Sequence, residues 1–179
     1  IVIAFLPLQL LAQLQFAPIF TSNMVLQRDQ PLQVWGKAKP GETVTVQFYD
    51  KQFQSVVKSD SSWSILLDKY GADIHPQQLT VSSQGKTILL ENILVGDVWV
   101  CIGQSNMEWP MKSELHYKEQ INKAQIQALR FYNPTYAGKN IYGTVFPDSI
   151  AKRLTIKDFY QGEWQNSDSN SFKTMSALA

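Results

Sequence analysis

A serine that could act as a nucleophile follows a short apolar run near the middle of the chain. Residues 98–102 carry only apolar, aromatic or sulfur side chains, several of them β-branched. Such a run is typical of a strand buried on both faces of a helix-flanked sheet. A polar turn follows at the carboxyl end of this predicted strand, where open α/β sheets bind their ligands. The turn comprises Gly103, Gln104, Ser105 and Asn106. The pattern predicts an exposed Ser105 hydroxyl beside backbone N–H groups, which suits attack on an ester.

The same residues also fit ordinary turn chemistry. The Gly-x-Ser-x-Gly motif of many esterases would require glycine at position 107, where this chain has Met107. A strand that ends in a polar turn explains Ser105 equally well. For Gln104 and Asn106, a role in orienting a loop or a sugar and a role in turn formation both remain open.

A longer string around Ser105 resembles a known family. Residues 103–110 read Gly-Gln-Ser-Asn-Met-Glu-Trp-Pro, and residues 95–99 before them read Val-Gly-Asp-Val-Trp. Together they are similar to the first block of the SGNH-type carbohydrate esterases related to sialate O-acetylesterase. Further similarities cover nearly the whole chain from about Phe16 onward. They lie at residues 22–28, 34–36, 40–44, 129–131, 162–164 and 172–177.

The resemblance implies an α+β chain with more than one domain. Residues 13–94 would form an antiparallel β-sandwich, jelly-roll-like in topology. Residues 95–179 would form the first part of a three-layer α/β/α SGNH hydrolase domain, truncated. The composition of short alternating strands with turn residues between them independently predicts an antiparallel sandwich before Leu94.

The resemblance also implies serine-dependent hydrolysis of acetyl esters on carbohydrates. The substrate would be an O-acetylated sialic acid or an acetylated plant polysaccharide. Ser105 would be the nucleophile, Gly103 would let the ester approach the turn, and Gln104 and Asn106 would support the loop. The family's Asp-x-x-His motif would lie beyond residue 179, so we expect these 179 residues alone to release no appreciable acetate. We expect no metal and no cofactor.

Neither histidine of the chain is a predicted base for Ser105. His75 lies in a predicted turn of the β-rich part, where a solvated imidazole is expected. His116 lies on a predicted helix that begins near Ser113 and extends towards Leu129. Glu108 is not assigned a role.

The elements that must support the serine follow from periodicity. Strands are predicted at 32–36, 44–48, 52–58, 63–67, 78–83 and 86–93, with hairpin connections at 59–62 and at Gln84-Gly85. Trp35 and Trp63 could stack on sugars, but their alternating strands favour the core for both.

After the serine, a strand is predicted near 130–132 and an irregular insertion at 135–157 over the face of the serine. The aromatic residues around this insertion could form a carbohydrate-stacking wall or simply pack the loop, and the sequence leaves both open. They are Tyr132, Tyr136, Tyr142, Phe146, Phe159 and Tyr160. A last helix is predicted from a cap at Asn170 or Ser171 to the end of the chain.

Composition narrows the possible partners and the compartment. The chain has 16 basic and 15 acidic residues and no basic cluster, so nucleic acid is not an expected partner. Its single cysteine, Cys101, excludes an internal disulfide and a cysteine-based zinc site, and is predicted to be a buried, inert thiol. Residues 1–12 are apolar and too short to span a bilayer. We interpret them as a signal-peptide remnant of a secreted or periplasmic protein, with a buried first strand as the alternative.

A second hypothesis comes from a different functional class. The β-rich part could be a non-catalytic carbohydrate-binding module with a degenerate appendage. An Asp-x-x-His motif further along the reading frame would favour the esterase, and its absence would favour the binding module.

Overall fold

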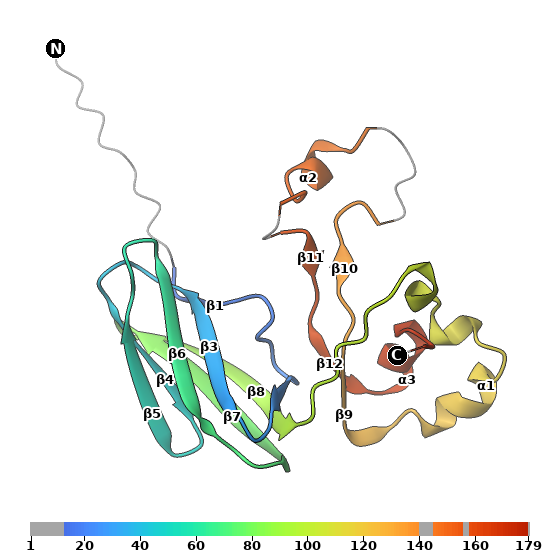
Figure 1. Ribbon diagram of the computed structural model, residues 1–179, viewed down its shortest axis with the longest axis horizontal. Coiled ribbons are helices and arrows are strands. Elements are labelled where there is room, and N and C mark those ends of the chain that lie inside the picture. The colour runs from blue at the N-terminus through green and yellow to red at the C-terminus, as the bar shows by residue number, and fades with distance from the viewer. Residues whose placement is uncertain (1–12, 140–144, 156–157, 179) are drawn as a thin grey trace.

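A computed structural model describes residues 13–139, 145–155 and 158–178. The predicted signal-peptide remnant at residues 1–12 lies outside the described residues, and so does Tyr142. Figure 1 shows two regions, and the chain passes once from the first to the second, at the end of β8. We call residues 13–96 the β region and residues 97–178 the serine region.

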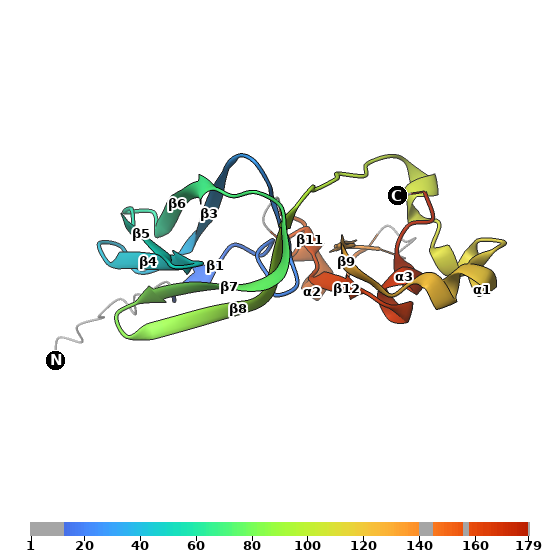
Figure 2. The same cartoon turned by 90° about the horizontal axis from the view of Figure 1, so that it is seen from below.

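The β region consists of eight strands in two sheets. The strands are β1 (Gln15–Phe16), β2 (Val25–Gln27), β3 (Pro31–Lys37), β4 (Thr43–Phe48), β5 (Lys51–Val56), β6 (Ser62–Lys69), β7 (Asp73–Ser83) and β8 (Lys86–Gly96). The smaller sheet has the order β1-β3-β6, and the larger has the order β2-β8-β7-β4-β5. Only the β2–β8 pair is parallel, and the other pairs are antiparallel. In Figure 2, β3 and β6 lie on one side of this region and β7 and β8 on the other.

The alternation seen in the sequence reflects one core shared by both sheets. Along β3 and β4 every second residue is buried, because successive side chains of a strand point to opposite faces. Burial of each such aliphatic side chain contributes about 1.5–3 kcal/mol. Fully buried members from both sheets include Val34, Val46, Phe48, Trp63, Leu67 and Val81. The predicted core position of Trp63 is confirmed, whereas Trp35 is 43% exposed on the outer face of β3, so its predicted core position is wrong.

The two predicted hairpin connections have different outcomes. Gln84 and Gly85 both have positive φ, 47° and 74°, and they join the antiparallel strands β7 and β8 as predicted. The turn at 59–62 does not form a hairpin, because β5 pairs with β4 while β6 pairs with β3. This turn instead carries the chain from the edge strand of the larger sheet to the edge strand of the smaller one.

The serine region is built from short elements. Its helices are η1 (Ser105–Glu108), η2 (Met111–Ser113), α1 (Tyr117–Gln120), η3 (Ile121–Lys123), α2 (Asp148–Ala151) and α3 (Ser169–Thr174), where η denotes a 3-10 helix. Its strands are β9 (Ile126–Tyr132), β10 (Thr135–Tyr136), β11 (Tyr160–Gln161) and β12 (Trp164–Ser167). β9 pairs with β12, and β10 pairs with β11, both antiparallel. No helix of the described residues is long and apolar enough to cross a membrane.

Two helix predictions in this region are wrong in extent. The helix predicted between Ser113 and Leu129 breaks into α1 and η3, and Leu129 lies in β9. The strand predicted at 130–132 is confirmed as the end of β9. The last helix begins earlier than predicted because Asp168, not Asn170 or Ser171, caps it, and it ends at Thr174.

Polar contacts connect the two regions. The Trp164 indole N–H donates to the carbonyl oxygen of Ile19 at 3.1 Å, and its backbone N–H donates to Thr21 Oγ1 at 2.9 Å. The Asn92 side chain donates to Asn23 Oδ1 at 2.7 Å and to Asn166 Oδ1 at 3.0 Å. Strand β12 is therefore attached to the β region by both side-chain and backbone groups.

Candidate active site

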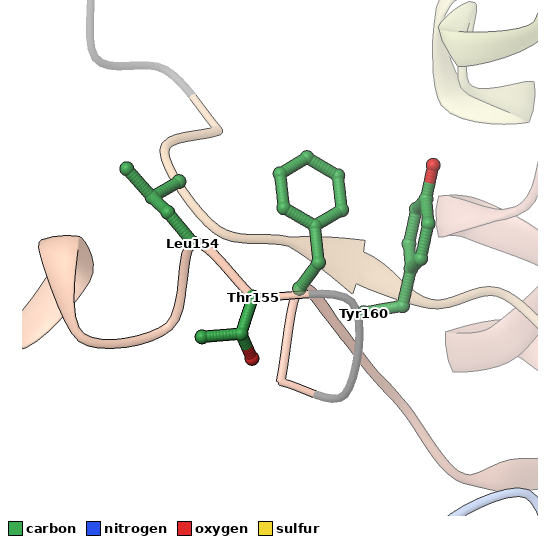
Figure 3. Close-up of a pocket in the computed structure, with 4 residues that line it drawn as sticks. Leu154, Thr155 and Tyr160 are labelled. Carbon is green, nitrogen blue, oxygen red and sulfur yellow. The ribbon is translucent and has the colours of Figure 1, made fainter.

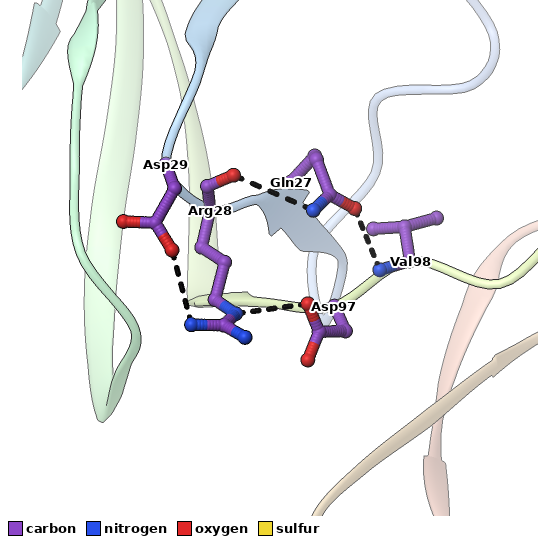
Figure 4. A network of polar contacts seen from close by, with 5 residues as sticks. All are labelled: Gln27, Arg28, Asp29, Asp97 and Val98. Carbon is purple, nitrogen blue, oxygen red and sulfur yellow. Dashed lines mark hydrogen bonds and ion pairs between the residues drawn. The ribbon is translucent and has the colours of Figure 1, made fainter.

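The segment that leads to Ser105 is fixed at its beginning. Arg28 Nε donates to Asp97 Oδ1 at 2.8 Å, and Arg28 Nη1 donates to Asp29 Oδ2 at 3.0 Å. Next to this ion pair, the backbone N–H of Val98 donates to Gln27 Oε1 at 2.8 Å (Figure 4). Arg28 lowers the pKa of Asp97, mainly through their hydrogen bond, so the carboxylate stays charged. These contacts hold the chain at the end of β8, where it leaves the β region.

Beyond Val98 the chain does not form the predicted strand. Residues 97–103 belong to no strand. Val98 is half-buried, and the side chains of residues 99–102 are exposed, with Trp99 and Ile102 each at 85%. Cys101 is exposed too, so the prediction of a buried thiol is also wrong. A strand buried on both faces needs neighbours at both edges and both faces. No described residue fills those positions, and the apolar run lies open.

Ser105 begins the 3-10 helix η1 directly after this segment. The backbone N–H of Met107 donates to the carbonyl oxygen of Gln104 at 2.9 Å, and that of Trp109 donates to Asn106 at 3.0 Å. A Cβ at Gly103 would lie 2.5 Å from Met107 Cγ, so the lack of a side chain allows the turn to fold back on itself. The polar turn is thus formed as predicted, although the strand before it is not.

The side chains of the turn point to solvent. Gly103, Gln104, Ser105 and Asn106 are all exposed, and the three polar side chains make no hydrogen bond to the described residues. The Ser105 hydroxyl is therefore accessible to a substrate.

The far side of the turn is held by the last described residues. The N–H of Met111 donates to the carbonyl oxygen of Met175, and the N–H of Ala177 donates to that of Trp109, both at 2.9 Å. α3, which precedes this contact, begins with a capping box in which Asp168 Oδ1 accepts from the N–H of Ser171 at 2.9 Å. That bond, helped by the N–H of Asn170, lowers the pKa of Asp168. The charged cap stabilises the helix that supports the serine turn.

No histidine contacts Ser105 in the described residues. The Nδ1 atom of His75 lies 2.9 Å from Asp73 Oδ1 in the β region, and His75 is largely exposed, in agreement with the expected surface position. His116 lies near Glu119, with 3.6 Å between Nδ1 and Oε2. Nor do three His, Cys, Asp or Glu side chains gather into a possible metal site within the part of the chain that is described.

A cavity of about 850 Å³ between the two regions was not predicted from the sequence. Its lining includes Asp73, the end of β8, residues 97–99 and much of β9. Arg130 also lines it, and burial lowers the pKa of this guanidinium. The sequence signal that could have indicated this cavity is the apolar run at 98–102. Val98, Trp99 and Cys101 of this run line the cavity.

Comparison with known proteins agrees with the resemblance found in the sequence. No family model matches the chain. The sialate O-acetylesterases of Pongo abelii and Homo sapiens are 30% and 32% identical to it over 177 aligned residues, 92% of the chain. The chain is similar to the sialate O-acetylesterases. The crystal structure of a carbohydrate acetylesterase from Xanthomonas citri matches 92% of the chain with a TM-score of 0.75 and 26% identity.

The similarity covers only part of each relative. The chain spans about a third of their length, 32% of the two mammalian sialate O-acetylesterases and 35% of the Xanthomonas citri protein. The predicted resemblance to the sialate O-acetylesterase-related family is confirmed over this part.

Proposed function

We propose that this chain is the amino-terminal part of a serine esterase that hydrolyses acetyl esters on carbohydrates. The observation that carries the proposal is the Ser105 hydroxyl. It is exposed, makes no hydrogen bond to the described residues, and lies in the block that resembles the nucleophile block of the family. The similarity to sialate O-acetylesterases and to a carbohydrate acetylesterase supports the same chemistry.

On this proposal the two regions belong to two domains. Residues 13–94 form a jelly-roll-like β-sandwich, and residues 95–179 form the first part of a three-layer α/β/α SGNH hydrolase domain. The shared core of the two sheets supports the first assignment. The exposed side chains of Trp99, Val100 and Ile102, together with the cavity beside them, support the second, because they offer apolar surface to further hydrolase-domain structure.

The proposed reaction has two steps. Ser105 Oγ attacks the acetyl carbonyl carbon while its proton passes to a base, and the backbone N–H of Ser105 stabilises the oxyanion. The C–O bond to the sugar then breaks, leaving an acetyl-serine and a free sugar hydroxyl. Water attacks the acetyl-serine and releases acetate. The base in this proposal is the histidine of the family's Asp-x-x-His motif, and neither His75 nor His116 contacts Ser105 in the structure.

Labelling by a fluorophosphonate probe tests the role of Ser105. In the product of the full reading frame, we expect labelling and acetate release from O-acetylated sialic acid, and we expect Ser105→Ala to abolish both. Ser113→Ala is the matched control, because Ser113 is also exposed, lies in the neighbouring helix η2 and carries the same hydroxyl. If Ser105→Ala retained turnover, or if label were found at Ser113 instead, the proposed nucleophile would be wrong.

We also propose that the protein is secreted or periplasmic, on the basis of the apolar residues 1–12. Amino-terminal sequencing of the protein isolated from culture medium or periplasm, beginning near residue 13, would agree with this proposal. An intact residue 1 in protein from the cytoplasm would contradict it.

One observation favours the alternative of a carbohydrate-binding module. Trp35 is 43% exposed on β3, beside a Gln33–Ser64 hydrogen bond of 2.8 Å, so an aromatic face and two polar groups lie together on the surface. If the full reading frame lacked an Asp-x-x-His motif and Trp35→Ala removed glycan binding, this alternative would replace the esterase.

A further inference from the structure

We propose that Gln27 and Arg28 of the β region are positioning residues for Ser105 in the proposed reaction. They contact residues 96–98, where the chain leaves β8 and leads to the serine turn. Neither residue makes a hydrogen bond to Ser105 in the described structure, so each acts through the segment before it. The inference rests on the proposed function, because it assumes that Ser105 is the nucleophile.

The first observation is the place of β2 beside the end of β8. β2 runs parallel to residues 94–96, the last three residues of β8, with Gln27 opposite Gly96. The N–H of Arg28 donates to the carbonyl oxygen of Gly96 at 2.9 Å, and the Leu26 side chain is buried in the core of the β region. The core therefore fixes β2, and β2 fixes the point at which the chain leaves the β region.

The second observation is that the Gln27 side chain continues this pairing beyond the end of β2. After Gln27 the backbone turns at Asp29, which has a φ of 61°. Gln27 Oε1 accepts a hydrogen bond of 2.8 Å from the backbone N–H of Val98, as Figure 4 shows. A side-chain amide oxygen thus takes the place of the carbonyl oxygen of a neighbouring strand. Val98 is half-buried, and a buried N–H that loses its acceptor costs free energy.

Arg28 adds a weaker contact to the same segment. Its Nε lies 2.8 Å from Asp97 Oδ1, and the two side chains are 42% and 54% exposed. Ion pairs at such exposed positions stabilise little, because solvent screens them. We therefore assign the larger positioning effect to Gln27 and the smaller one to Arg28.

The third observation is that the segment before the serine has no other attachment of this kind. No backbone hydrogen bond joins residues 99–103 to the described residues. The next attachment after Val98 is at residues 109–111, which bond to the residues that follow α3. The location of Ser105 is therefore determined by the contacts at Val98 and by those beyond η1.

Loss of one attachment would displace the proposed nucleophile. A chain segment that is held at one end samples more positions than a segment held at both ends. Attack needs the serine oxygen about 3–3.5 Å from the acetyl carbon, and a displacement of about 1 Å can lower a rate about 100-fold. Removal of an interaction that only orients the attacking group lowers kcat with little change in KM. We therefore expect Gln27 to affect kcat rather than KM.

Steady-state kinetics on the product of the full reading frame test this inference. Gln27→Met keeps the length of the side chain and removes the oxygen that accepts from Val98. We expect kcat for acetate release from O-acetylated sialic acid to fall about tenfold, and KM to stay within about twofold. Arg28→Gln removes the ion pair and should lower kcat about threefold. Each kcat is expressed per Ser105 labelled to completion by fluorophosphonate, so a variant that only unfolds loses labelled sites and keeps its kcat.

Two control variants, one in each region, separate positioning from general destabilisation. Gln54→Met makes the same exchange on β5, where Gln54 Nε2 donates to Thr45 Oγ1 at 3.2 Å inside the β region. Thr155→Val removes a hydrogen bond of 2.8 Å to the Asp158 carboxylate in the serine region, at a pocket of about 430 Å³ (Figure 3). We expect both variants to leave kcat and KM within about twofold of the parent.

The role of the acceptor oxygen has its own comparison. Gln27→Glu keeps an oxygen that can accept from Val98, and its kcat should stay within about threefold of the parent. A tenfold fall in this variant would overturn the positioning role. Should Gln27→Met fail to fold, Gln27→Asn provides the same test, because its amide is one methylene too short to reach Val98.

The outcomes distinguish this inference from the proposed function. A labelled and active parent whose kcat is unchanged in Gln27→Met would overturn the positioning role alone. An equal fall in Gln54→Met would do the same, because the loss would then not depend on the contact with Val98. A parent protein without label at Ser105 would overturn the proposed function, and this inference with it.

Discussion

The β region and the serine region bury their apolar side chains in different ways. Every residue of the main core cluster lies in the β region, between Leu14 and Val95. In the described part of the serine region only two hydrophobic side chains are buried, those of Ala124 and Ala137, while Trp99 and Ile102 are 85% exposed. The β region is thus held by a core of its own, whereas the serine turn is held by hydrogen bonds at its two ends.

The difference shows where stability and chemistry are located. A core of this kind contributes most of the folding free energy of a small domain. An exposed loop contributes little, but it leaves its hydroxyl and amide groups free for a substrate. The proposed nucleophile lies in the less stabilised region, next to a firmly packed one.

The largest expected effect is a test of the core. Trp63 is 1% exposed and packs edge-on against Phe16 with ring centroids 5.8 Å apart, so Trp63→Ala should lower the free energy of unfolding by about 3–5 kcal/mol. Urea denaturation followed by circular dichroism measures the change. Trp35→Ala is the comparison and should cost clearly less, about 1–2 kcal/mol, since that side chain is 43% exposed although its ring packs edge-on against Phe20 at 4.6 Å. Equal losses in the two variants would show that the core does not dominate stability.

The next effect depends on pH and concerns the edge of the β region that faces the cavity. Hydrogen bonds lower the pKa of Asp73 to about 2, first that from the backbone N–H of His75, then those from the Tyr49 hydroxyl and the His75 side chain. In the unfolded chain the carboxyl group titrates at its ordinary value of about 3.9. The stabilisation is therefore present above about pH 4 and is lost as the pH falls towards 2.

Urea unfolding midpoints between pH 2 and 6 test this dependence. We expect Asp73→Asn to flatten the acid side of the profile, and Tyr49→Phe to reduce its slope only in part, because it removes one hydrogen bond of four to the carboxylate. An unchanged profile in Asp73→Asn would mean that other carboxylates determine the acid sensitivity.

The contrast between the regions also explains which predictions from sequence succeeded. In the β region alternation reports a core formed by the same residues, so the strands around Val34 and Val46 were predictable. Trp35 was wrongly predicted to be in the core. The buried residues of β3 alternate along the strand at Leu32 and Val34, and this alternation places Trp35 on the outer face. The turn at 59–62 could not reveal a change of sheet, because local turn chemistry does not specify the partner of the next strand.

Around Ser105 the local turn was predicted correctly and the strand before it was not. The turn that exposes Ser105 was predicted from its residues, since Gly103 and the polar side chains act locally. The strand at 98–102 depends on partners distant in sequence, and a local pattern of apolar residues cannot show whether they are present.

The junction of the two regions should show a smaller effect. The Asn92 side chain bonds to Asn23 and Asn166 and accepts from Arg130 Nη2 at 3.3 Å, so Asn92→Ala should cost about 1–2 kcal/mol. Part of that cost is strain, because Asn92 has a φ of 58°. Asn92→Gly removes the same hydrogen bonds without the strain and is the matched comparison.

Hydrogen exchange distinguishes a local role of Asn92 from a global one. We expect faster exchange of the β12 amides in both variants, with β7 and β8 unchanged. Protection of β12 equal to that of the parent chain would mean that the contacts of Trp164 alone hold the two regions together.

The smallest expected effect concerns the apolar run before the serine. Trp99→Ala should change the free energy of unfolding by less than about 0.5 kcal/mol, because the indole is 85% exposed and loses little contact on truncation. The amides of residues 99–103 should also exchange far faster than those of β8, since no backbone hydrogen bond from them is made to the described residues. A loss above about 1 kcal/mol would show that Trp99 packs against the cavity in solution. The serine region would then have an apolar core of its own, and its contrast with the β region would be one of degree.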